Sequence, residues 1–121
     1  MPYSVLVVDD EASVRQLIGL LIETDERFTL FGTAPDGRRA LDRVEERCPD
    51  AIVCDIRMPG MSGLEALPRL KAACAEAIIV IYSADPAART ALTLGADRVL
   101  DKSVEASDVL DVVAEMCRNK Q

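Results

Sequence analysis

Residues 51–70 read AIVCDIRMPGMSGLEALPRL and contain three kinds of segment in succession. The apolar run 51–54 is short and continuous, which is typical of a strand buried on both faces of a sheet. Asp55 follows it directly, and a loop with one proline and two glycines comes next. Leucines then recur at helical spacing. This stretch predicts a strand, a loop and a helix, with one carboxylate at the carboxyl end of the strand.

The same alternation extends along the whole chain of 121 residues. Further apolar runs suited to strands occupy residues 5–8, 28–31, 77–82 and 98–100. Apolar residues at helical spacing lie within residues 14–22, 40–44, 87–92 and 109–116. Because strands and helices alternate, we predict an α/β fold of the flavodoxin-like (βα)5 type. Its five-stranded parallel sheet would have the order 2-1-3-4-5, with helices on both faces, in one domain covering residues 1–121.

Glycine and proline mark the expected boundaries. Asp36 and Gly37 predict the start of the second helix, and Gly95 predicts the end of the fourth. Pro68 lies inside the third helical pattern, so it predicts a kink or a loose first turn there.

The composition limits the classes of partner and of chemistry. The net charge is −7, whereas proteins bind duplex nucleic acid through clustered Lys and Arg, so we expect no direct nucleic-acid binding by this chain. The chain has no histidine, which excludes a histidine nucleophile, a His-ligated zinc site and a Ser-His triad. The longest apolar run, residues 77–82, is far shorter than a membrane span. We therefore expect no membrane contact.

The cysteine pattern predicts the redox state of the compartment in which the protein works. Cys48, Cys54, Cys74 and Cys117 form no CxxC pair, and their spacings fit neither a zinc site nor a secreted disulfide framework. We expect free thiols that act as small apolar side chains in or near the core. Scattered free thiols indicate a reducing, cytoplasmic location.

Polar side chains gather where the predicted strands end. Asp9 and Asp10 follow the first strand, Asp55 the third, Ser83 ends the fourth, and Lys102 follows the fifth. Ligands of open α/β sheets bind outside the carboxyl ends of the strands at the topological switch point, so we expect these side chains to meet. Clustered carboxylates repel unless a cation joins them, and oxygen ligands without His or Cys favour Mg²⁺. One carboxylate could then act as nucleophile toward a phosphoryl group.

Each of these residues alone has an ordinary interpretation. An acidic pair after a strand commonly caps a helix, and an aspartate before a Pro-Gly loop is a common turn residue. The joint placement at four strand ends favours the phosphoryl-transfer site.

The motifs resemble the receiver domain family of two-component response regulators, which includes the chemotaxis regulator. The similarity lies in residues 5–11, 52–65, 82–84 and 95–97 and in Lys102. It covers essentially the whole chain, and the loop after Asp55 is its most specific part. The resemblance implies a phosphoacceptor switch rather than an enzyme, with a sensor histidine kinase or a histidine phosphotransfer protein as phosphodonor.

The resemblance also implies a role for each site residue. Asp55 would accept the phosphoryl group, Ser83 would hydrogen-bond it, and Lys102 would pair with it. The implied Mg²⁺ ligands are the carboxylates of Asp10 and Asp55, the backbone carbonyl of Arg57 and, through water, Asp9.

Two positions depart from the family pattern. Val99 stands three residues before the lysine, where an aromatic residue is usual, so the coupling of the switch region at Ser83 and Val99 to an output is in question. Ser103 stands where the family has proline in a cis peptide. A cis bond before a non-proline residue costs about 3–4 kcal/mol. We predict a trans Lys102–Ser103 bond, or a strained cis one, and a shifted loop.

Arg57 and Asp85 occupy variable positions, two residues after Asp55 and Ser83 respectively. In the family such positions tune the lifetime of the phosphoryl group. We hypothesise an ion pair across the pocket mouth that limits attack by water. Two solvated side chains are the ordinary alternative, because exposed pairs contribute little to stability.

Three other functions are open at this stage. An aspartate-nucleophile phosphohydrolase usually has a second acid two residues after the nucleophile, where this chain has Arg57. A flavin binder usually offers aromatic stacking, and this chain has no Trp, two Tyr and two Phe. A degenerate receiver conflicts with the intact acidic set. The output is also open: the chain is either a stand-alone receiver or part of a longer regulator. In the family, the fourth helix, fifth strand and fifth helix form the usual face for a homodimer or an effector.

Overall fold

The computed structural model describes residues 1–120 and contains one five-stranded parallel sheet in the order β2-β1-β3-β4-β5. The strands are β1 (Tyr3–Val8), β2 (Phe28–Ala34), β3 (Ala51–Cys54), β4 (Ile78–Ser83) and β5 (Arg98–Asp101). The helical segments are α1 (Ala12–Glu23), α2 (Gly37–Glu46), α3 (Gly63–Ala73), η1 (Pro86–Leu94) and α4 (Ala106–Lys120). The flavodoxin-like (βα)5 prediction and its strand order are confirmed.

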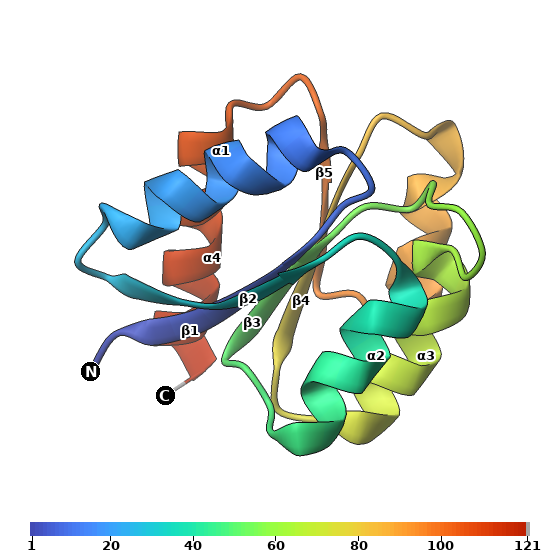
Figure 1. The fold of residues 1–121 in the computed structure, drawn as a ribbon, viewed down its shortest axis with the longest axis horizontal. Helices are drawn as coiled ribbons and strands as arrows, with labels where there is room; N and C mark the ends of the chain where they lie inside the picture. The colour runs from blue at the N-terminus through green and yellow to red at the C-terminus, as the bar shows by residue number, and fades with distance from the viewer. Residues whose placement is uncertain (121) are drawn as a thin grey trace.

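Helices cover both faces of the sheet. Figure 1 shows α2 and α3 on one side and α1 with α4 on the other. Successive strand residues point to opposite faces. Leu6 and Ile52 therefore pack into the core beneath α2, α3 and η1, while Val5 and Val53 pack into the core beneath α1 and α4. All four side chains are at most 2 % exposed, so the short apolar runs are buried on both faces as predicted.

The register of the strands brings distant residues together at the carboxyl end of the sheet, where all five strands stop. Val8 pairs with Cys54 across β1 and β3, so the residues that follow them, Asp9 and Asp55, emerge side by side. Ser83 pairs with Asp101 across β4 and β5, which places Lys102 next to the end of β4. The opposite end, where the strands begin, is called the amino end of the sheet below.

The fourth helical segment differs from the expected α-helix. η1 is a 3-10 helix that begins after Asp85, whose carboxylate accepts a hydrogen bond from the Ala87 amide, and Pro86 occupies its first position. It ends as predicted at Gly95, which has a left-handed φ of 114° and donates its N–H to the Ala91 carbonyl. Its nine residues form a longer 3-10 run than is usual.

Pro68 leaves α3 continuous from Gly63 to Ala73. The first turn is not loose, because the Ser62 side chain accepts from the Glu65 amide and the Glu65 side chain accepts from the Ser62 amide. This capping box stabilises the turn that the proline was expected to loosen. The Lys102–Ser103 bond is trans, as is every peptide bond among residues 1–120.

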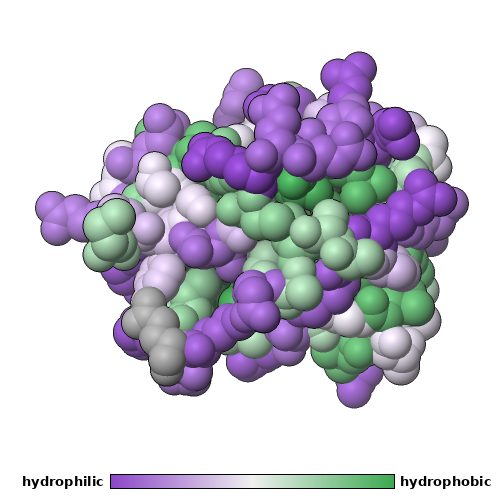
Figure 2. Space-filling model, turned by 90° about the horizontal axis from the view of Figure 1, so that it is seen from below, coloured by the Kyte–Doolittle hydropathy of each residue, from purple (hydrophilic) through white to green (hydrophobic). Residues whose placement is uncertain are grey.

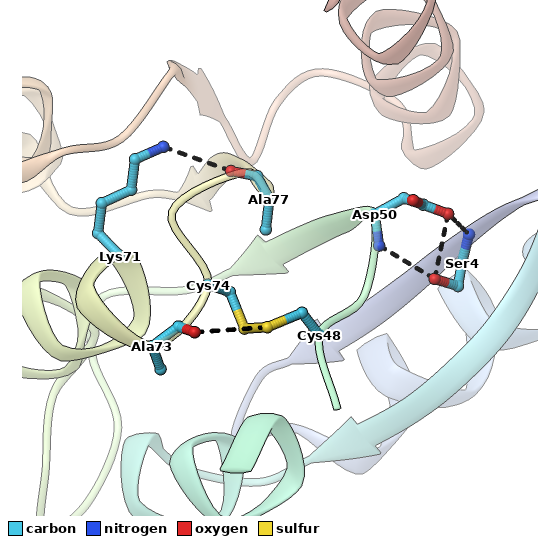
Figure 3. Close-up of a disulfide and its surroundings, with 7 residues drawn as sticks. All are labelled: Ser4, Cys48, Asp50, Lys71, Ala73, Cys74 and Ala77. Atoms are coloured by element: carbon cyan, nitrogen blue, oxygen red, sulfur yellow. Dashed lines mark hydrogen bonds between the residues drawn. A yellow bond between two sulfur atoms is a disulfide. The ribbon is translucent and has the colours of Figure 1, made fainter. Parts of the chain in front are cut away.

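The cysteine prediction is wrong for two of the four residues. Cys48 and Cys74 form a disulfide, with their Cα atoms 5.7 Å apart (Figure 3). They are 26 residues apart in sequence and meet because α2 and α3 are neighbours that end side by side. Cys54 and Cys117 are free and buried, as predicted. The inference of a reducing compartment from scattered thiols therefore loses part of its basis.

The surface is mixed in character. Figure 2 shows one face of the molecule on which hydrophobic areas lie among hydrophilic side chains. Among the described residues, the large exposed hydrophobic side chains are Met1, Leu17, Leu20 and Leu92. Within residues 1–120, none of the helices has the length and apolar character that a membrane crossing requires.

Candidate functional site

Three carboxylates converge at the carboxyl end of the sheet. Asp9 and Asp10 follow β1, Asp55 follows β3, and one oxygen from each lies within 4.8 Å of the others. Asp9 is buried, Asp55 is partly buried and Asp10 is exposed, so the cluster opens to solvent on one side. These are three of the residues that the sequence predicted would meet.

The backbone fixes the two inner carboxylates. The Asp9 amide donates to the Ala34 carbonyl at 3.0 Å, and the Asp55 amide donates to the Val8 carbonyl at 2.9 Å, so each residue continues its strand's ladder. Each carboxylate also accepts one backbone N–H, Asp9 from Glu11 at 3.0 Å and Asp55 from Ile56 at 2.7 Å. Each therefore keeps one oxygen for the centre of the cluster.

Lys102 supplies the positive charge. Its Nζ lies 2.9 Å from Asp9 Oδ2 and 3.4 Å from Asp55 Oδ2. Burial alone would lower the pKa of Lys102, but the hydrogen bond to Asp9 and the charges of Asp55 and Asp9 outweigh it, and the pKa lies above its ordinary value. Lys102 is therefore charged at neutral pH and partly balances the three carboxylates.

Ser83 lies at the end of β4 and is 3 % exposed. Its backbone carbonyl accepts from the Lys102 amide at 3.2 Å, which ties the serine and lysine strands together. Its hydroxyl oxygen accepts from the Asp85 amide at 3.1 Å. The hydroxyl is thus held by the loop that follows β4. Val99, the other residue of the predicted switch region, is partly buried against the core beneath η1.

The loop after Asp55 is held at both ends by glycines that sequence reasoning treated only as turn residues. The Gly63 amide donates to the Ile56 carbonyl at 2.8 Å, and the Gly37 amide donates to the Met61 carbonyl at 3.2 Å. A Cβ on Gly63 would lie 2.0 Å from the Asp55 carbonyl oxygen, so no larger residue fits without moving the backbone of the site. The amino-terminal ends of α2 and α3 therefore press directly on this loop.

Arg57 and Asp85 form the expected ion pair. Arg57 Nε lies 2.8 Å from Asp85 Oδ2, and the Arg57 side chain is 83 % exposed while that of Asp85 is 12 % exposed. The hydrogen bond from Arg57 holds the pKa of Asp85 below its ordinary value. Both side chains line a depression of about 460 Å³ beside the cluster, together with Asp10 and Met58.

Arg15 is a further site residue that the sequence analysis missed. Its Nη1 donates to the Asp9 backbone carbonyl at 2.7 Å, so α1 holds the end of β1 in place. A polar residue such as Arg15 on an amphipathic helix gives no sequence signal for a contact with the backbone six residues earlier.

The donor set fits a small divalent cation. Three carboxylates with oxygen donors, and neither histidine nor a cysteine ligand among them, favour Mg²⁺ or a similar hard ion. Burial raises the pKa of the nearby Cys54 thiol to about 12, with Asp55 and Asp9 adding to the effect, so this sulfur stays a neutral thiol. The three aspartates are therefore the candidate metal ligands.

Comparison with known proteins points the same way. The response regulator receiver domain family matches residues 5–114. The chain is 39 % identical over 129 residues to a protein-glutamate methylesterase/protein-glutamine glutaminase of Shewanella sp. (strain MR-4), covering 98 % of this chain and 36 % of that protein. It is 35 % identical over 112 residues to the nitrate/nitrite response regulator protein NarL of Escherichia coli (strain K12), covering 90 % of this chain and 52 % of NarL. The chain thus spans about a third to a half of the length of these relatives. The crystal structure of the response regulator domain of Thermotoga maritima CheB has a TM-score of 0.86 and 29 % identity, covering 98 % of each chain.

Proposed function

The chain belongs to the response regulator receiver domain family, and from that premise we propose that it is a signalling switch phosphorylated on Asp55. The observation that supports this most directly is the cluster of Asp9, Asp10 and Asp55 at the carboxyl end of the sheet, with Lys102 paired to Asp9 and Asp55. We also propose that residues 1–121 form one receiver domain.

The proposed reaction transfers a phosphoryl group from a phosphohistidine, or from a small acyl phosphate, to an oxygen of Asp55. A P–O bond to the carboxylate forms as the bond from phosphorus to the donor breaks, and the donor leaves with the bonding electron pair. Asp55 Oδ1 accepts a hydrogen bond from the Ile56 amide, whereas Oδ2 faces Lys102 at 3.4 Å, so Oδ2 is the proposed nucleophile. Phosphoryl transfer depends mainly on positioning and on neutralising charge.

The other site residues would hold the transferred group and the metal. Lys102 would pair with a phosphoryl oxygen in place of its present contact with Asp55, and the Ser83 hydroxyl would donate to another. Bound Mg²⁺ would supply neutralisation of the phosphoryl and carboxylate charges. Its proposed ligands are Asp10, Asp55, the Arg57 backbone carbonyl and, through water, Asp9.

We propose that the Arg57–Asp85 pair limits access of water to the acyl phosphate. The pair joins the loop after β3 to the loop after β4, and it borders the depression beside the carboxylates. Arg57→Ala and Asp85→Ala should each speed dephosphorylation several-fold, with Arg38→Ala as a matched exposed control. Unchanged rates in both variants would mean that the pair is only a surface contact.

The proposed phosphodonor is a sensor histidine kinase or a histidine phosphotransfer protein. We propose that η1, β5 and α4 form the face for a homodimer or an effector, because Val99 and the Lys102 loop connect that face to the site. This chain would itself be no enzyme beyond slow self-dephosphorylation, would work in the cytoplasm, and would contact neither nucleic acid nor membrane directly. The relatives are longer proteins, of which this chain covers 36 % and 52 %, and their activities belong to those whole proteins.

The test is intact-mass spectrometry after incubation with Mg²⁺ and acetyl phosphate. The wild type should gain the mass of one phosphoryl group, and Asp55→Asn or a chelator should abolish the gain. Asp50→Asn is a matched control, because Asp50 lies at the amino end of the sheet. A gain that persists in Asp55→Asn would reject the acceptor. Multiple turnover of phosphate release without accumulation of the adduct would instead favour a phosphohydrolase.

A further inference from the structure

The disulfide joins two helices at the end of the molecule opposite to the carboxylates. Cys48 lies in the connection between α2 and β3, and Cys74 follows the last residue of α3 (Figure 3). The two helices pack against each other on one face of the sheet, so the bond fastens their carboxyl-terminal ends together (Figure 1).

Backbone hydrogen bonds fix Cys74 itself, and the chain two residues after Cys48, without the help of the sulfur atoms. Two residues after Cys48, the Asp50 amide donates to the Ser4 carbonyl at 3.0 Å, and the Asp50 carbonyl accepts from Ile78 at 3.0 Å. The Cys74 amide donates to Leu70 at 2.9 Å, and its carbonyl accepts from Ala77 at 3.1 Å. Reduction would therefore leave two thiols already facing each other, which favours reformation of the bond.

The two sulfur-bearing residues differ in exposure. Cys48 is exposed to solvent, whereas Cys74 is 3 % exposed. Thiol–disulfide exchange requires an attacking thiolate to reach one sulfur, and exposed disulfides are the more labile ones. The free cysteines Cys54 and Cys117 are 1 % and 5 % exposed and lie outside the bond, so an attacking thiol meets one accessible cysteine.

We propose that Cys48–Cys74 is a reversible thiol–disulfide exchange site whose point of attack is the sulfur of Cys48. A thiolate of a low-molecular-weight thiol bonds to Cys48 Sγ, the Sγ–Sγ bond breaks, and Cys74 leaves with the electron pair and takes a proton. A second thiolate then attacks the attached sulfur of the mixed disulfide and releases Cys48 as a thiol. The protein gains two electrons and two protons, and the two thiols become a disulfide.

The redox state of the pair sets how firmly the carboxyl-terminal ends of α2 and α3 are held together. The amino-terminal ends of the same helices hold the loop after Asp55, through the Gly37–Met61 and Gly63–Ile56 backbone bonds. Reduction should loosen the pair of helices from the amino end of the sheet. This consequence concerns the helices themselves and does not depend on phosphorylation of Asp55.

The test is a redox titration of the folded protein in buffers of reduced glutathione and glutathione disulfide. Thiols are alkylated without denaturant and located by peptide mass spectrometry. Cys48 should become alkylatable as the reduced fraction rises, the buried Cys54, Cys74 and Cys117 should stay unlabelled, and glutathione disulfide should protect Cys48 again by restoring the bond. A bond that opens only in denaturant, or two thiols that glutathione disulfide fails to join, would overturn the proposal.

Two variants identify the point of attack. In Cys74→Ser the remaining Cys48 should form a stable mixed disulfide with glutathione, and in Cys48→Ser the buried Cys74 should not. Cys117→Ser is a matched control that should leave the titration unchanged. A mixed disulfide on Cys74 instead of Cys48 would contradict the assignment. Amide hydrogen exchange around Cys74 and Ala77 should rise several-fold on reduction, and equal exchange in both redox states would reject the fastening role.

Discussion

At the carboxyl end of the sheet, Asp9, Asp10 and Asp55 cluster and Lys102 pairs with Asp9 and Asp55, whereas at the amino end the Asp50 carboxylate accepts hydrogen bonds from Ser4. Ser4 donates both its amide and its hydroxyl to the Asp50 carboxylate, at 2.8 Å and 3.2 Å. The first arrangement keeps negative charge in excess and ready for a cation. The second uses one oxygen of Asp50 to fix the start of β1 beside the start of β3. The same residue type is thus placed for chemistry at one end and for stability at the other.

The largest expected effect tests how tightly the carboxyl end is packed. Gly63→Ala should destabilise the fold by more than about 3 kcal/mol, because its Cβ would meet the Asp55 carbonyl oxygen at 2.0 Å. Gly60→Ala is the matched control. It has open space around it, and only its positive φ of 73° is strained, at about 1–2 kcal/mol. Urea unfolding measures both, and equal losses would mean that the contact at Gly63 relaxes easily.

The next effect tests the covalent bond near the amino end. The free energy of unfolding of the oxidised wild type should exceed that of the Cys48→Ser/Cys74→Ser double variant by about 2–3 kcal/mol. The reason is that the bond links residues 26 positions apart and so constrains the unfolded chain. A reducing agent should lower the free energy of unfolding of the wild type to that of the double variant. If the wild type and the double variant unfold at the same urea concentration under oxidising conditions, the bond contributes nothing to stability.

A smaller pair of effects should have opposite signs at the two ends. Asp10→Asn should stabilise the metal-free protein by about 0.5–1 kcal/mol, because it removes like-charge repulsion. Asp50→Asn should destabilise it by about 1 kcal/mol, because it weakens the bonds from Ser4. Thermal unfolding with a chelator present measures both. Losses of stability in both variants would remove the contrast between the two ends.

The smallest expected effect lies at the surface, in the segment just before β2. Arg27 bridges Asp25 at 2.7 Å and Asp111 at 2.9 Å, and its hydrogen bond holds the pKa of Asp25 below the ordinary value of 3.8. The ionised Asp25 therefore contributes to stability above pH 3.8, and this contribution is lost as the pH falls through the lowered pKa. Arg27→Met should lower the free energy of unfolding by less than about 1 kcal/mol at neutral pH, as measured by urea unfolding. The difference from the wild type should shrink below pH 3.8 and in high salt. A difference that is constant with pH would contradict this origin.

Local patterns were sufficient for most of the fold. The apolar runs 5–8 and 51–54 specify strands buried on both faces, and the residues that directly follow them had to emerge together once the strand order was known. The cluster of Asp9, Asp10 and Asp55 and its contact with Lys102 were predictable for that reason. The Arg57–Asp85 contact was predictable because both residues begin loops at the same end of the sheet.

The rest depends on three-dimensional packing that the sequence does not display. Cys48 and Cys74 meet because two helices end side by side, a fact with no counterpart in their spacing. Gly63 was interpreted as a turn residue, although the packing of α3 against the Asp55 carbonyl is what requires it. The 3-10 form of η1 also has no counterpart in the sequence, where apolar residues recur at α-helical spacing.

Tyr82 gives the molecule a built-in optical reporter. The chain has no tryptophan and two tyrosines, so its near-ultraviolet emission comes from Tyr3 and Tyr82. The ring of Tyr82 lies 5.4 Å from Lys102 Nζ, and its hydroxyl donates to the Val104 carbonyl, while Tyr3 lies near Phe28 at the opposite end of the sheet. A movement of the lysine toward a new anion would change the emission of one tyrosine and leave the other unchanged. Replacing Tyr3 with Phe would thus leave a single fluorophore beside the site, visible without any attached dye.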